Sequence, residues 1–170
     1  MMSETALVII NMQSVRASKE TDYYLGNMHV MLEKMNYLIA YAREMGYKII
    51  FVKHLEASGA FSERSPLSEF FPDLDIQEQD TIIEKKKISA YYQTQMESEL
   101  SGIKNLVICG ALTNLCVRMF VEESYDRGFR IAILEDLTAC FSSELQEMTL
   151  EDLYTTRSGL NILTLEKFVE

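Results

Sequence analysis

Continuous apolar runs alternate with amphipathic stretches along the chain. Residues Thr5–Ile10 form an apolar, β-branched run, which is typical of a strand buried on both faces of a sheet. Between Asn27 and Met45, apolar side chains recur every three or four residues, and this single stripe predicts a helix. Gly46 stands where a left-handed helix cap is expected, and residues 47–52 then predict a second strand. This β-α-β order predicts a parallel pair of strands.

The rest of the chain continues the alternation of strands and helices. Further strands are predicted at residues 80–84, 105–109, 129–134 and 161–165. Further helices are predicted at about residues 94–101, 114–127 and 143–155. Residues 54–79 hold both prolines and predict an irregular excursion. The order predicts an α/β fold, a three-layer α-β-α sandwich with a mainly parallel central sheet, formed by one domain over residues 1–170.

Composition narrows the class of protein. The 170 residues are 48% hydrophobic, so collagen-like, low-complexity and disordered chains are excluded. Acidic residues outnumber basic ones by 26 to 16, giving a net charge of −10, which disfavours nucleic acid and anionic membranes as partners. The three cysteines make no disulfide framework, and neither a signal-like start nor a membrane-length apolar run occurs. We therefore expect a soluble, cytoplasmic protein.

The strand end near Cys116 offers the clearest candidate chemistry, because ligands of parallel sheets bind beyond the carboxyl ends of strands. If Thr113 caps the following helix, Cys116 lies in its first turn. The helix dipole and free backbone N–H groups there favour a thiolate and an oxyanion. A small, buried, unreactive cysteine is an equally open interpretation. Cys109 is expected in the core and Cys140 in a structural position.

Two other strand ends carry polar side chains. Lys85 closes a predicted strand, and a lysine there can pair with a thiolate, although a solvated charge run is the alternative. Asn11 and Gln13 follow the first strand and are expected to satisfy backbone groups in its turn. His54, at the end of the second strand, has no metal-ligand spacing to His29. No Gly-rich phosphate loop occurs, so we expect neither a metal nor a cofactor.

Three segments resemble the signatures of the isochorismatase-like cysteine hydrolase superfamily: residues 6–13, Lys85 with residues 89–91, and residues 110–117. The resemblance implies an isochorismatase-like, Rossmann-like topology and a catalytic aspartate, lysine and cysteine. By motif, the lysine falls on Lys85, the nucleophile on Cys116 and the aspartate position on Asn11. It also implies a cis peptide between Ala111 and Leu112, with the Leu112 and Cys116 N–H groups facing an oxyanion. Gln13 and Thr113 are expected to contact and orient these groups without touching the substrate.

The asparagine at position 11 departs from the family pattern. A neutral amide cannot shuttle a proton, and losing a positioned acid–base group costs about 10²–10⁴ in rate. Without a carboxylate competing for Lys85, however, thiolate formation at Cys116 should be easier. Another acid would have to move protons, and the loops near Asp22 or Glu56 are the places to look.

Two functions follow from the resemblance. One is hydrolysis of a C–N bond in a small amide by Cys116. The other is a catalytically silent or impaired member that binds a ligand or assembles with partners. The resemblance also implies a homo-oligomer, a dimer or tetramer.

Metal binding is not expected, because residues 54–56 do not reproduce the Asp-x-His motif of nicotinamidase-like members. Specificity would come from loops 14–27, 54–79 and 136–144. Candidate lining aromatic residues are Phe61, Phe70, Phe71 and Tyr91.

Overall fold

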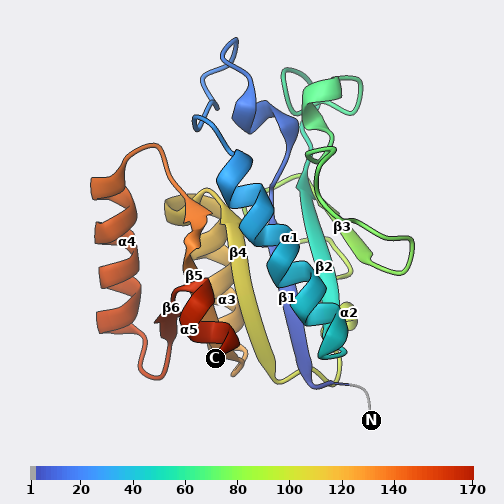
Figure 1. Cartoon of the computed structure of the whole chain (residues 1–170). Helices are drawn as coiled ribbons and strands as arrows, with labels where there is room; N and C mark the ends of the chain where they lie inside the picture. Colours follow the sequence, from blue (N-terminus) through green and yellow to red (C-terminus); the bar gives the residue numbers. More distant parts are fainter. Residues whose placement is uncertain (1–2) are drawn as a thin grey trace.

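A six-stranded, all-parallel sheet forms the centre of the molecule (Figure 1). The structure is a computed structural model that describes residues 3–170. The strand order is β3-β2-β1-β4-β5-β6. The strands are β1 (Thr5–Ile10), β2 (Lys48–His54), β3 (Thr81–Lys85), β4 (Asn105–Ala111), β5 (Arg130–Ala139) and β6 (Asn161–Leu163). The predicted α/β class with a parallel central sheet is therefore confirmed.

Helices cover both faces of this sheet. They are α1 (His29–Glu44), α2 (Met96–Glu99), α3 (Arg118–Asp126), α4 (Ser143–Thr156) and α5 (Leu165–Val169), with short turns η1 (Ser14–Ala17), η2 (Pro66–Ser68) and η3 (Thr113–Val117). The apolar residues of α1 and α5 pack on one face, and those of α2, α3 and α4 pack on the other (Figure 1). Within residues 3–170, no helix has both the length and the apolar character needed to cross a bilayer.

The continuous apolar run of β1 follows from this two-sided burial. Leu7 and Ile9 pack toward α1, whereas Val8 and Ile10 pack toward α3. Because successive side chains of a strand point to opposite faces, a strand covered on both sides needs apolar residues at every position. All four side chains are fully buried.

Several predicted boundaries were wrong, each for a local reason. β5 continues to Ala139 because, after a register shift, it pairs again with β4 through Thr138 and Gly110. Gly110 thus lies inside β4 rather than after it. The last strand ends at Leu163, since the Thr164 hydroxyl accepts from the Lys167 N–H and begins α5, which the sequence reading missed. The helix predicted at 94–101 is limited to α2.

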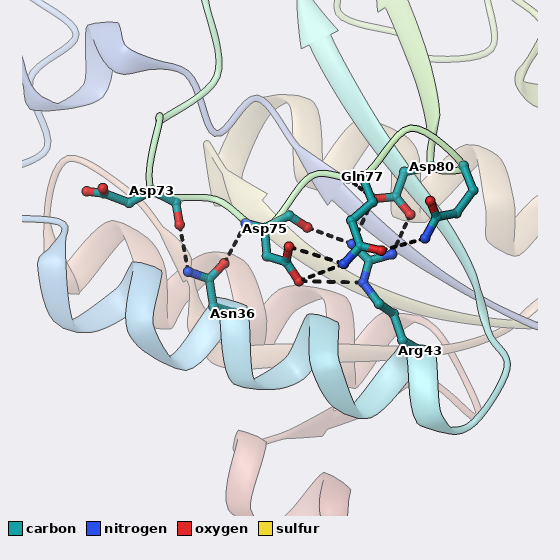
Figure 2. Close-up of polar contacts among 7 residues, drawn as sticks. Asn36, Arg43, Asp73, Asp75, Gln77 and Asp80 are labelled. Carbon is teal, nitrogen blue, oxygen red and sulfur yellow. Dashed lines mark hydrogen bonds and ion pairs between the residues drawn. The ribbon is translucent and has the colours of Figure 1, made fainter.

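Side chains of α1 fasten the segment that returns from the excursion to β3 (Figure 2). Arg43 donates from Nη1 and Nη2 to the two carboxylate oxygens of Asp80, at 2.7 and 2.9 Å. Seven residues earlier in α1, the Asn36 amide donates to the Asp73 carbonyl and accepts from the Asp75 N–H, at 2.7 and 2.9 Å. These bonds fix the path into β3, whose last residue is Lys85.

Candidate active site

The candidate site lies at the carboxyl edge of the sheet, beside its two central strands, β1 and β4. Successive strands β1, β2 and β3 are added from the centre toward one edge of the sheet, and β4, β5 and β6 toward the other edge. Between β1 and β4 lies the switch point at which parallel sheets commonly bind ligands. Asn11 follows β1 there, with its N–H donating to the Val52 carbonyl at 2.9 Å. The segment that carries Cys116 follows β4.

Lys85 and Cys116 meet at this edge. The Lys85 Nζ lies 3.3 Å from the Cys116 Sγ, 2.8 Å from the Lys87 carbonyl oxygen and 3.2 Å from Nδ1 of His54. Lys85 is 1% exposed, and all three N–H groups of its ammonium have an acceptor. Burial lowers the pKa of Lys85, and the adjacent Cys116 sulfur opposes this shift. The site therefore holds a buried ammonium that can both stabilise a sulfur anion and release a proton.

His54 extends this contact away from the sulfur. Because the lysine can only donate, Nδ1 of His54 is the acceptor and Nε2 carries the proton. That Nε2 lies 3.1 Å from the Glu56 carboxylate. Burial lowers the pKa of His54, and the nearby Lys85 lowers it further. A chain of polar contacts thus runs from Cys116 through Lys85 and His54 to Glu56.

Gln13 holds His54 in place. Its side-chain amide donates to the His54 and Ser68 carbonyls at 2.9 and 2.6 Å, and its carbonyl accepts from the His54 N–H at 2.9 Å. Gln13 is fully buried. It therefore joins the end of β1 to the end of β2, which is a larger role than the turn contacts expected from the sequence.

Asn11 occupies the position that the motif comparison gives to a carboxylate. Its backbone has a φ of +52°, a left-handed conformation that asparagine and aspartate adopt more easily than most residues. The side chain is 1% exposed, and its Oδ1 has no hydrogen-bond partner among residues 3–170. The structure thus joins Lys85 directly to Cys116 and leaves a buried amide oxygen at the third position.

Cys116 lies in a wider turn than the one predicted. Residues Thr113–Val117 form a π-type turn, with the Val117 N–H donating to the Leu112 carbonyl at 3.1 Å, and α3 begins only at Arg118. The prediction that Thr113 caps the helix was wrong. Its hydroxyl instead donates to the Gln146 side chain of α4 at 2.5 Å. The turn therefore presents Cys116 at the head of α3, half-buried against the core.

The chain enters this turn through a close approach of two strands. Gly110 has a φ of +118°, and a Cβ there would lie 2.1 Å from the Ile10 carbonyl oxygen. The next peptide bond, between Ala111 and Leu112, is cis, at the position that the resemblance implied. The assignment of the Leu112 and Cys116 N–H groups as oxyanion donors stays a prediction.

The segment after Lys85 is fastened to α3. The Ser89 hydroxyl donates to the Glu123 carboxylate at 2.8 Å. Tyr91 stacks on Phe120 with ring centroids 5.3 Å apart, and its hydroxyl lies 2.8 Å from that of Ser124. Burial raises the pKa of Tyr91 to about 12. These contacts hold the lysine segment against the helix that follows Cys116.

The aromatic residues considered for the pocket have different positions. Phe61 packs edge-on against the His54 ring, with centroids 5.1 Å apart, so it lies at the site. Phe71 is buried and Phe70 partly buried in the apolar cluster on the α1 side, and Tyr91 packs on α3 as described.

Two residues near the site were not recognised from the sequence. His54 was treated only as the end of a strand, although its position two residues before Glu56, beyond a predicted strand, was a usable signal. Arg16 was not considered, and it lies in η1, only 4% exposed. Cys109 lies in the core as expected, where burial raises its pKa. Cys140 lies just beyond β5, where its thiol donates to Oδ1 of Asn114 at 3.1 Å.

The donor set does not fit a metal ion. Among residues 3–170, no group of three or more His, Cys, Asp or Glu side chains is arranged to hold one. In addition, both ring nitrogens of His54 are engaged, one of them by an ammonium. A cation at this imidazole would face the positive charge of Lys85.

Comparison with known proteins identifies the family of this chain. A family model described as the isochorismatase domain matches residues 5–167. Nicotinamidase 3 of Arabidopsis thaliana is 37% identical over 76 residues, or 44% of this chain, and the chain spans only 38% of that relative's length. The ureidoacrylate amidohydrolase RutB of Acinetobacter baylyi is 24% identical over 91% of this chain and 78% of its own.

The fold gives the same result. The crystal structure of an isochorismatase-like hydrolase from Alkaliphilus metalliredigens superposes with a TM-score of 0.87, covering 98% of both chains at 20% identity. Since the family model spans nearly the whole sequence and the architecture agrees with it, this chain belongs to the isochorismatase domain family.

Proposed function

We propose that this protein is a cysteine hydrolase that cleaves a C–N bond of a small amide, with Cys116 as the nucleophile. The observation that carries the proposal is the 3.3 Å contact between the buried Lys85 ammonium and the Cys116 sulfur. A cation in contact with a thiol favours the thiolate, which is the nucleophilic form. Relatives named as a nicotinamidase and as a ureidoacrylate amidohydrolase support an amide substrate.

In the proposed first step, the Cys116 thiolate attacks the amide carbon and the carbonyl becomes an oxyanion. The N–H groups of Leu112 and Cys116 stabilise that oxyanion. The Lys85 ammonium gives a proton to the departing nitrogen, the C–N bond breaks, and the amine leaves a thioester on Cys116. The lowered pKa of Lys85 suits it to this donation.

In the second step, neutral Lys85 takes a proton from water, and the hydroxide adds to the thioester carbon. The C–S bond then breaks, which releases the carboxylic acid and restores the Cys116 thiolate and the Lys85 ammonium. No carboxylate is needed at position 11 in this scheme. Asn11 would orient the substrate or the water, while His54 and Glu56 keep the Lys85 ammonium aligned.

The second candidate is a family member that binds a ligand without turnover. The neutral Asn11 side chain favours it, because a thiolate without an efficient proton carrier could form an adduct and stop.

We also propose that the molecule is a cytoplasmic protein that acts on a small molecule without a cofactor and, from the resemblance, that it is a homo-oligomer. Apolar side chains exposed on α1 and α4 support an assembly: Val30, Tyr37, Leu145, Met148 and Tyr154.

Release of ammonia or amine from a panel of small amides tests the proposal. We expect turnover by the natural sequence and none by Cys116→Ser. Cys140→Ser is the matched control, because Cys140 is also a half-buried free thiol on the same edge of the sheet. Its replacement should leave the rate within about twofold of the starting protein.

The Asn11→Asp variant separates the two candidates. Aspartate tolerates the left-handed backbone at this position and supplies a proton carrier, so we expect kcat to rise by about 10²-fold. Absence of turnover by both the natural protein and Asn11→Asp, across the whole panel, would overturn the hydrolase assignment and favour the silent member.

A further inference from the structure

Arg16 is a buried cation whose hydrogen-bonding groups are left open. It is 4% exposed, and its Nε and Nη1 have no hydrogen-bond partner among residues 3–170. No Asp or Glu in this part of the chain forms an ion pair with it. A buried charge without a partner is costly. The buried Arg16 therefore points to a bound ligand that supplies the missing hydrogen-bond acceptors.

Two aromatic rings lie beside this guanidinium. The Arg16 carbon Cζ lies 5.3 Å from the centroid of the Phe61 ring and 6.0 Å from that of Tyr23. These two rings pack edge to face against each other, with centroids 4.9 Å apart and planes at 69°, so both lie on the same side of the guanidinium. Tyr23 is 36% exposed, so this aromatic pair reaches the surface. The rings supply no hydrogen-bond acceptor in the plane of the guanidinium, and its Nε and Nη1 donors stay open.

The same guanidinium belongs to the surroundings of the nucleophile. The Cys116 sulfur acts on the pKa of Arg16 in the raising direction, against burial, which lowers it. Arg16 in turn lowers the pKa of both Lys85 and His54. The Phe61 centroid lies 5.3 Å from the Arg16 Cζ and 5.1 Å from the centroid of the His54 ring. Arg16 therefore lies beside the candidate active site.

The charges of this site do not balance. Lys85 and Arg16 are two buried cations, and the Cys116 thiolate supplies at most one negative charge. The nearest carboxylate on the chain of contacts, Glu56, is 46% exposed at its side chain and is engaged by His54. Asn11 adds no charge. In a molecule with a net charge of −10, the site is a local positive centre in which one positive charge has no counter-charge.

We propose that Arg16 binds a carboxylate of the substrate, so that the substrate class is short amides that also carry a carboxylate group. The inference rests on the proposed hydrolase function for the position of the scissile amide at Cys116. A carboxylate offers two coplanar oxygens, and it pairs with two N–H groups of one guanidinium, of which Arg16 has Nε and Nη1 open. The neutral amide then lies between the two cations, with its carbonyl carbon toward the sulfur.

Binding to the Cys116→Ala protein tests the inference without requiring turnover. The probes are malonamate, succinamate and glutaramate, each compared by calorimetry with its neutral diamide. We expect at least one acid to bind about tenfold to hundredfold more tightly than its diamide. This preference should disappear in Arg16→Gln and be partly kept in Arg16→Lys, which retains the charge without the planar fork. Because the Cys116→Ala protein has no nucleophilic sulfur, a preference that depends on Arg16 reports on ligand binding and not on reaction with the thiol.

Arg127→Gln is the matched control, since Arg127 also stacks on a ring, that of Tyr91 at 3.9 Å, but lies away from the site. It should keep the full preference. If every acid binds no better than its diamide, or if Arg16→Gln keeps the preference, the inference is overturned. Carboxylate binding through Arg16 with no turnover by the natural protein or by Asn11→Asp would overturn the proposed hydrolase alone, and turnover of amides with no preference for acids would overturn the inference alone.

Discussion

The Lys85 ammonium lies 3.2 Å from Nδ1 of His54, so the lysine that contacts the candidate nucleophile is also bonded to a neutral imidazole. This pair joins the ends of β2 and β3, which are neighbours in the sheet and pair His54 with Lys85 in register. A protonated His54 would bring two positive charges together in a mostly buried place. The pair therefore links the stability of the site to pH.

The His54→Gln variant should weaken this pH dependence. The pKa of His54 is lowered by burial and by Lys85, whereas an unfolded histidine titrates near about 6.5. As the pH falls below that value, the unfolded chain gains a proton that the folded protein resists, so the free energy of unfolding decreases until the lower folded pKa is passed. Denaturant unfolding between pH 5 and 7.5 should show a smaller decrease for His54→Gln.

The exposed His29 at the start of α1 provides the control for that measurement, and His29→Gln should keep the slope of the natural protein. Equal slopes for His54→Gln and the natural protein would contradict the linkage between His54 and the site.

Lys85→Met should slow the reaction of Cys116 with iodoacetamide at pH 7 by about tenfold or more, because the sulfur anion loses its cationic partner. Mass spectrometry can follow each cysteine separately, with Cys140 as the internal reference. Lys86→Met removes an exposed lysine next in the chain and should leave the labelling rate unchanged. Circular dichroism must show that Lys85→Met is folded. Equal rates in a folded Lys85→Met protein would show that the contact does not activate the thiol.

Gly110→Ala should be among the most damaging small substitutions in the chain. The added Cβ would lie 2.1 Å from the Ile10 carbonyl oxygen, where β1 and β4 meet, and the φ of +118° disfavours any side chain. We expect a loss of more than about 4 kcal/mol of unfolding free energy, or no folded protein. Gly128→Ala has a similar positive φ but no atom within 4 Å of its Cβ, so it should cost only about 1 kcal/mol. Similar costs for both variants would refute the close approach.

Arg43→Met should loosen the segment that leads into β3. The Asp80 side chain is 3% exposed and loses both bonds from the guanidinium, so we expect a loss of about 3 kcal/mol in urea unfolding. Arg64→Met, at an exposed position of the excursion, should change stability by less than about 0.5 kcal/mol. If both variants unfold at the same urea concentration, the network in Figure 2 does not contribute to stability.

The sequence by itself determined the architecture and pointed to four residues of the candidate site: Asn11, Gln13, Lys85 and Cys116. Runs such as β1 could be recognised because strand and helix periodicities are local properties that a few neighbouring residues express. Lys85 and Cys116 were found because each closes or follows a strand and belongs to a recognisable motif. The boundaries of α5 and of the turn before α3 were missed, since both depend on contacts with distant segments. The turn is held by Gln146 of α4, and α5 packs on the sheet face that also carries α1.

Only the tertiary structure decided what surrounds the sulfur. Whether His54 titrates freely or bonds to a lysine depends on the register of β2 with β3, and no local pattern reports that register. Arginine in a loop is usually exposed to solvent. Arg16 is instead buried against Tyr23 and Phe61, because two loops that are distant in the chain pack together. Local sequence fixes which face of an element is apolar, whereas the burial of a charge depends on segments far apart in the chain.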